Sequence, residues 1–116
     1  MAYYKKEDCV SGKVEELKEK DFILQTKKGT VLVDFWAKWC KTCKIVEPYL
    51  DDLAKTWNDK IKFYKVNVTE NPGLASRMGV MSLPNILILE GGKVKDQIIG
   101  TTTKKAIEDK IKKIAK

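Results

Sequence analysis

The residues with the clearest chemistry in this sequence are two cysteines, Cys40 and Cys43. They follow an apolar run, residues 30–36, that is typical of a strand covered on both faces, and they open a segment of helical periodicity. The first turn of a helix offers unpaired amide N–H groups and the positive end of the helix dipole, which both stabilise a thiolate at Cys40. Cys43 lies one turn further on and deeper. We therefore predict thiol–disulfide exchange, in which Cys40 attacks a substrate disulfide and Cys43 resolves the mixed disulfide.

The alternative for a Cys-x-x-Cys pair is half of a zinc or iron–sulfur site. Such sites usually need four ligands, whereas this chain has one further cysteine, Cys9, and no histidine. We therefore expect no metal and no other cofactor. The lack of histidine also removes the usual catalytic triads and imidazole bases. Cys9 is expected to be a surplus free thiol, with intermolecular pairing as the alternative.

A carboxylate stands inside the predicted buried strand. Side chains alternate along a strand, so Asp34 shares a face with Leu32 and Trp36, which are both apolar. Burial disfavours the charged form, and we expect it to raise the pKa of Asp34. If that face of the strand were half-exposed instead, Asp34 would be an ordinary surface carboxylate.

The elements that must position these groups follow from hydrophobic periodicity and from turn residues. In order they are a short strand at 14–17, a helix at 21–28 closed by Gly29, the strand at 30–36, a helix from Cys40 that contains Pro48, a strand at 61–68, a helix at 72–78 capped by Asn71, strands at 85–90 and 93–99 joined by Gly91-Gly92, and a last helix capped by Thr102 or Thr103. Helices between strands imply parallel pairing, and the final hairpin adds an antiparallel pair. We predict an α/β fold with a central mixed sheet, mostly parallel, flanked by helices on both faces.

Length and composition narrow the class of protein. The 116 residues fit one domain, which we place at residues 13–116 behind a charged lead-in at residues 1–12. No apolar run reaches the roughly 20 residues needed to span a bilayer, and no secretory signal is visible, so we expect a cytoplasmic location. The net charge is +7, but the lysines are scattered and Arg77 is the only arginine. Because arginine dominates base readout, we expect no nucleic-acid partner. We also expect no membrane partner, and a monomer.

The segment around the dithiol carries a family resemblance. Residues 31–44 resemble the active-site segment of the thioredoxins nearly residue for residue. Further matches, in the same order and at the same spacing, are Pro48, Lys65-Val66-Asn67-Val68, Asn71-Pro72-Gly73, Gly79-Val80, Leu83-Pro84, Gly92 and Gly100. The resemblance covers residues 13–116 and implies the thioredoxin fold, a central mixed sheet flanked by helices.

The resemblance also implies a role for two charged residues. As in thioredoxins, Asp34 would relay a proton to and from Cys43, and Lys65 would lie near this aspartate. The alternative for Lys65 is an ordinary surface lysine on a strand, because lysines are mostly exposed.

A substrate-binding surface is implied as well. Pro84 would be held cis, facing the dithiol, and would leave the backbone of Leu83 free to pair with an extended substrate. Trp39 and the loop at 79–83, which includes Met81, would form the apolar docking surface. Core packing is the alternative for Trp39, and Trp36 is expected in the core.

The chain departs from the family pattern between the two cysteines. Thioredoxins usually have Gly-Pro there, whereas this chain has Lys41-Thr42, which we include among the substrate-binding residues. Lys41, flanked by Lys38 and Lys44, adds positive charge that favours the Cys40 thiolate and therefore the reduced form. We predict a redox potential somewhat less reducing than the roughly −270 mV of thioredoxin, and a preference for acidic partners.

The predicted function is that of a protein-disulfide reductase, a thioredoxin-type electron carrier. Its partners would be disulfide-containing protein substrates and a thioredoxin reductase or an equivalent electron donor. One alternative is a specialised donor to a single enzyme, for which Lys41-Thr42 is the hint. Another is a non-catalytic module that binds partners through the Pro84 loop. The intact dithiol together with Asp34 favours the reductase.

Overall fold

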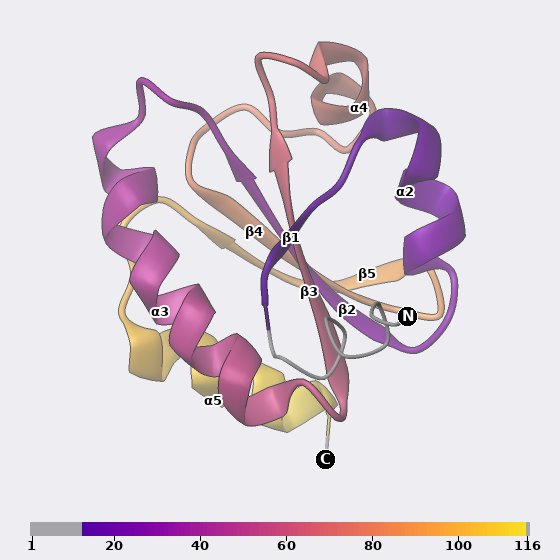
Figure 1. Cartoon of the computed structure of the whole chain (residues 1–116), viewed down its shortest axis with the longest axis vertical. Helices are drawn as coiled ribbons and strands as arrows, with labels where there is room; N and C mark the ends of the chain where they lie inside the picture. Colours follow the sequence, from indigo (N-terminus) through magenta and orange to yellow (C-terminus); the bar gives the residue numbers. More distant parts are fainter. Residues whose placement is uncertain (1–12, 116) are drawn as a thin grey trace, which may run out of the picture.

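The computed structural model describes residues 13–115, which form a sheet of five strands with helices on both of its faces (Figure 1). The expected lead-in at residues 1–12, including Cys9, lies outside the described residues. Along the chain the elements follow the predicted order. Across the sheet the order is β1-β3-β2-β4-β5, so β2, the strand that leads into the dithiol, is central.

Strand β2 (Thr30–Trp36) has a neighbour on each edge, which accounts for its continuous apolar run. Strand β3 (Ile61–Asn67) lies parallel to it on one side, and β4 (Asn85–Glu90) lies antiparallel on the other. The short strand β1 (Glu15–Glu16) extends the sheet beyond β3, and β5 (Lys93–Ile99) extends it beyond β4. The bounds of β2, β4 and β5 agree with the sequence prediction.

The sheet has a larger antiparallel share than the sequence predicts, because β4 runs against β2 even though a helix precedes it. That helix, α4 (Pro72–Arg77), has six residues and is roughly 9 Å long. The seven residues of β3 extend for roughly 23 Å. The helix is therefore too short to carry the chain back along the sheet, and it stays beyond the end of β3 (Figure 1). The chain re-enters from that same end, with Asn85 beside Phe35.

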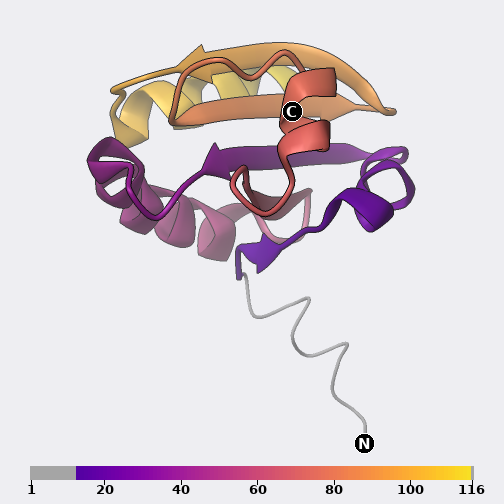
Figure 2. The same cartoon turned by 90° about the horizontal axis from the view of Figure 1, so that it is seen from above.

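Two apolar clusters cover the two faces of the sheet, as the alternation along β2 requires. Leu32 belongs to the cluster under α3 (Lys41–Trp57) and α5 (Lys104–Ile114). Val33, on the opposite face, belongs to the cluster under α2 (Glu19–Thr26) and α4. Figure 2 shows the helices separated by the strands. Within residues 13–115, no helix combines the length and the apolar character needed to cross a bilayer.

Helix α2 begins at Glu19, two residues earlier than predicted, and a tertiary contact explains the difference. The backbone N–H of Glu19 donates to Oδ1 of Asn71, at 3.0 Å. This acceptor lies far away in sequence, so the local pattern gives no sign of it. Asn71 does stand at the N-cap position of α4, but its side chain makes no capping hydrogen bond to that helix. Its amide instead donates to the carbonyl of Asn67, at 3.0 Å.

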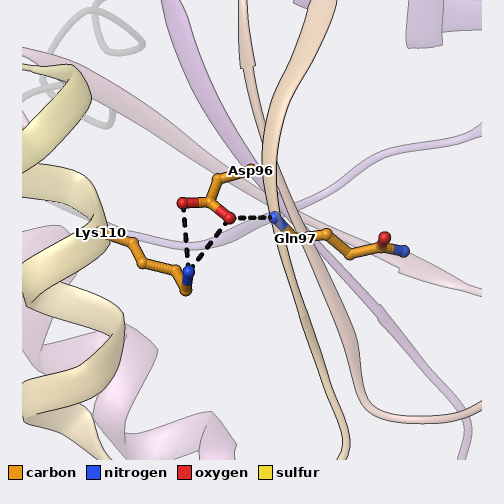
Figure 3. A network of polar contacts seen from close by, with 3 residues as sticks. All are labelled: Asp96, Gln97 and Lys110. Carbon is orange, nitrogen blue, oxygen red and sulfur yellow. Dashed lines mark hydrogen bonds and ion pairs between the residues drawn. The ribbon is translucent and has the colours of Figure 1, made fainter.

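Helix α5 is anchored to the edge strand β5 by an ion pair (Figure 3). Lys110 Nζ lies 3.1 and 3.2 Å from the two carboxylate oxygens of Asp96, which also accepts from the N–H of Gln97 at 2.8 Å. Partial burial raises the pKa of Asp96, but these two donors outweigh it and hold the pKa below its usual range. The helix begins after the second of the two threonines offered by the sequence, because Thr103 Oγ1 accepts from the N–H of Ala106 at 3.1 Å.

Candidate active site

The two predicted redox cysteines meet where β2 passes into α3. Cys40 is the N-cap of α3, and its sulfur accepts a hydrogen bond from the N–H of Cys43 at 3.2 Å. The two side chains are joined as a disulfide with a Cα–Cα distance of 5.3 Å. Thr42 Oγ1 lies 3.4 Å from Cys40 Sγ, and because a disulfide sulfur carries no hydrogen, the hydroxyl is the donor. Cys40 Sγ therefore receives two donors from the first turn of α3.

The two cysteines differ less in exposure than the sequence suggests. Cys40 is 6 % exposed and Cys43 is 4 % exposed, so the expectation of an exposed attacker is wrong for this disulfide form. Both side chains, with Ala37, lie in one small apolar cluster, and the ring formed by the disulfide leaves little of either sulfur uncovered. The difference between them is one of surroundings. Cys40 follows Trp39, which is 71 % exposed, whereas Cys43 lines a pocket behind the disulfide.

Asp34 is buried on the face of β2 that α3 covers, as predicted. Its Oδ1 atom is enclosed and has no hydrogen-bond partner. Burial raises the pKa of Asp34 to about 7, the carboxylate of Glu47 contributes to the rise, and the ammonium of Lys65 opposes it. A carboxyl group in this state can gain or lose a proton near neutral pH.

The pocket behind the disulfide has a volume of about 270 Å³ and brings Asp34 and Cys43 into one space. Lys65 also lines it, and this lysine is not an ordinary surface residue, because its side chain is 26 % exposed. Its ammonium lies 5.3 Å from the ring centroid of Trp36 and 3.5 Å from Oε2 of Glu47. The pocket is completed by further residues of the N-terminal strand region, β2, the following loop and α3, namely Val14, Lys38, Lys44, Leu50 and Asp51.

The Pro84 loop lies on another side of the dithiol. The peptide bond between Leu83 and Pro84 is cis, as the resemblance implies. Leu83 packs against the apolar cluster that contains both cysteines. Met81, two residues earlier, is 93 % exposed, and the exposure of Trp39 excludes core packing for that side chain. The structure thus brings the loop to the cysteines and leaves two large apolar side chains exposed around them.

Three observations complete the comparison with the sequence. Trp36 is half-buried rather than fully in the core, although its indole nitrogen is enclosed without a partner. Among residues 13–115, no group of three or more His, Cys, Asp or Glu side chains is placed to hold a metal ion. Glu47 was not singled out from the sequence, yet it lines the pocket. Its position four residues after Cys43 places both on one helix face, and this spacing is the signal that would have found it.

Comparisons with known proteins agree with this geometry. The thioredoxin family model matches residues 13–113. A thioredoxin from Chlorobaculum thiosulfatiphilum is 43 % identical over 104 residues, which are 87 % of this chain and 95 % of that protein. The chloroplastic thioredoxin M4 from Arabidopsis thaliana is 40 % identical over 111 residues, 92 % of this chain and 58 % of that protein. The solved structure of a thioredoxin from Malassezia sympodialis superposes with a TM-score of 0.82 at 29 % identity and covers 90 % of this chain and 93 % of that chain.

A mixed sheet of this topology with a Cys-x-x-Cys pair at the start of α3 defines a thiol–disulfide oxidoreductase domain. The chain belongs to the thioredoxin family. It spans about half the length of several chloroplastic relatives that it matches, from 48 % to 58 %. Chloroplastic and bacterial thioredoxins match at similar identity, so the comparisons do not single out one compartment.

Proposed function

We propose that this chain reduces protein disulfides by dithiol–disulfide exchange. The observation that carries the proposal is the Cys40–Cys43 pair at the start of α3, with the buried Asp34 sharing a pocket with Cys43. The exposed apolar side chains around the pair offer a surface on which a substrate protein can dock. The intact dithiol favours this function over that of a non-catalytic binding module.

The exchange has two steps. The thiolate of Cys40 attacks one sulfur of the substrate disulfide, the other substrate sulfur leaves as a thiolate and takes up a proton, and a mixed disulfide remains. Cys43 then passes its thiol proton to the carboxylate of Asp34 and attacks Cys40 Sγ. The second substrate sulfur leaves and is protonated. The substrate gains two electrons and two protons, and this chain is left with the Cys40–Cys43 disulfide.

Asp34 suits its part in the second step because its pKa of about 7 lies close to the operating pH, where a general base is most effective. Lys65 lines the same pocket and would balance the negative charge that develops there. The substrate itself would contact the exposed and cis-proline sides of the site, through Trp39, Lys41, Thr42, Met81, Leu83 and Pro84.

The partners in this proposal are disulfide-containing proteins and an electron donor of the thioredoxin reductase type. Lys38, Lys41 and Lys44 are exposed around the dithiol, which favours substrates with acidic residues near their disulfide. We propose a monomer in the cytoplasm, where thiols are kept reduced. Gel filtration with light scattering tests the first point, and fractionation of the source cells tests the second.

Turnover of insulin disulfides, with a chemical dithiol as electron source, tests the proposed activity. The full chain should accelerate reduction, and both Cys40→Ser and Cys43→Ser should abolish the acceleration. A Cys9→Ser variant is the matched control and should keep full activity. No acceleration by the unmodified chain would leave the binding module as the better account.

A trapping experiment separates a general reductase from a donor dedicated to one enzyme. In Cys43→Ser the mixed disulfide on Cys40 cannot be resolved, so substrates should remain attached and be released by reductant. Many different proteins recovered from the source cells support a general reductase. One dominant adduct supports the dedicated donor, and Cys40→Ser gives the background.

A further inference from the structure

The pocket contains a second carboxylate that the proposed mechanism does not use. Glu47 lies on α3, four residues after Cys43 and four before Asp51, so the three residues share one face of the helix. All three line the pocket that also contains Asp34. The Glu47 side chain is 53 % exposed, which shows that no apolar packing requirement fixes it there.

The cation nearest to hand for Asp34 is paired with Glu47 instead. In the parallel register of β2 and β3, Asp34 stands beside Lys65, and side chains at paired positions of adjacent strands point to the same face. Yet the Lys65 ammonium lies 3.5 Å from Oε2 of Glu47 and over the ring of Trp36. Among residues 13–115, no ion pair or hydrogen bond joins it to Asp34, whose Oδ1 has no partner.

The charges that face Asp34 come from every element around the pocket. Lys38 lies in the loop after β2, Lys44, Glu47 and Asp51 lie on α3, and Lys65 lies on β3. After burial, the two charged groups with the largest effect on the pKa of Asp34 are Glu47, which raises it, and Lys65, which lowers it. Asp51 is affected in the same direction, since partial burial and Glu47 raise its pKa.

We propose that Glu47 is a positioning residue that holds the Lys65 ammonium in an ion pair and so leaves the buried Asp34 carboxyl without a cation partner. Asp34 is then free to exchange its proton with Cys43. This inference rests on the proton exchange proposed above for Asp34. It assigns to Glu47 a role in the reaction without contact to the reacting sulfurs.

The protonation of Asp34 tests the inference directly. NMR of the Asp34 carboxyl carbon, followed against pH in the full chain, gives its titration midpoint. In Glu47→Gln the midpoint should fall by about one pH unit, because one negative charge is lost and Lys65 becomes free to approach Asp34. Glu47→Asp keeps the charge and should restore most of the midpoint. Asp52→Asn removes the same charge from α3 outside the pocket, beside Lys104, and should leave the midpoint unchanged.

A double-mutant cycle tests whether Lys65 carries the effect. If Glu47 acts by holding Lys65, the Glu47→Gln shift should be clearly smaller in a Lys65→Gln background than in the unmodified chain. An equal shift in both backgrounds would overturn the inference. An unchanged midpoint in Glu47→Gln would overturn it as well.

The pH profile of insulin reduction links the midpoint to the reaction. Because Asp34 accepts a proton, the rate should rise with pH as Asp34 ionises, and Glu47→Gln should move this rise to lower pH by the same amount as the NMR midpoint. If Asp34→Asn leaves the profile unchanged, the proposed role of Asp34 fails. If Asp34→Asn removes the rise but Glu47→Gln does not move it, that role stands and the inference about Glu47 fails.

Discussion

The hydroxyl of Thr42 lies 3.4 Å from Sγ of Cys40 and donates to it, so the residue that replaces the usual proline of the family supplies a hydrogen bond to the attacking sulfur. Proline has no such donor. The other donor to this sulfur, the N–H of Cys43, depends on the backbone of α3 alone. Thr42 is therefore a side chain through which this particular sequence can adjust the reactivity of its first cysteine.

Removal of the hydroxyl should make the Cys40 thiolate harder to form. In a Cys9→Ser background, the ultraviolet absorbance of the thiolate followed against pH should show a midpoint about one pH unit higher in Thr42→Val, since a hydrogen bond to a charged group contributes about 1.5 kcal/mol. Thr42→Ser keeps the donor and should stay close to the unmodified chain. Equal midpoints for the valine and serine variants would refute the hydrogen bond.

The redox potential should be less negative than the roughly −270 mV of thioredoxin, because groups that stabilise the Cys40 thiolate stabilise the reduced form. Equilibration with glutathione mixtures measures it. Lys41→Gln should shift the value toward more negative potentials by less than about 30 mV, the equivalent of a tenfold change in the equilibrium constant, since exposed charges are screened. A value at or below that of thioredoxin for the unmodified chain would contradict this prediction.

Reduction of an acidic substrate should slow as salt rises, because the exposed lysines around the dithiol attract it over a distance that salt shortens. Replacing Lys38, Lys41 and Lys44 by glutamine should lower the rate at low salt and flatten the salt dependence. The matched control replaces three exposed lysines of α5, Lys105, Lys112 and Lys113. Equal losses in both triple variants would show that only net charge matters.

Asp34 should make the oxidised protein less stable as pH rises. Its pKa is about 7 in the folded chain and about 3.9 when unfolded, so the folded state binds more protons between these values. Stability is then highest below about pH 4, declines up to about pH 7 and is level above, with a total change of about 4 kcal/mol.

Denaturant titrations of Asp34→Ala check that prediction. At about pH 8 the variant should unfold with a free energy on the order of 2 kcal/mol higher than the unmodified chain, because no charge is buried and only part of the gain is lost to packing. The advantage should disappear near pH 4. Asp52→Asn, an exposed carboxylate on the same face-covering helix, should show no such pH-dependent gain.

Local chemistry was enough to predict several elements to the residue. Gly91 and Gly92 have positive φ angles of 62° and 85°, which glycine adopts without strain, and the strands they join were predicted with the observed bounds. The strand β2 was predicted as well, because a continuous apolar run needs cover on both faces. The dithiol and the buried state of Asp34 follow from the same pattern.

Features that depend on distant contacts were missed or wrong. The direction of β4 follows from the shortness of α4 relative to the sheet. The start of α2 depends on Asn71, which is remote in sequence. The exposure of Cys40 was overestimated because ring closure and the neighbouring Ala37 cover its sulfur.

The sequence by itself determined the chemistry of this protein: a Cys-x-x-Cys pair after a buried strand, an aspartate inside that strand and a proline loop at family spacing. Only the tertiary structure decided which charges meet behind the dithiol. Asp34 and Lys65 are neighbours across β2 and β3, yet Lys65 pairs with Glu47 of α3. Charges act through space at a few ångströms, and that distance is set by how a helix lies across a sheet.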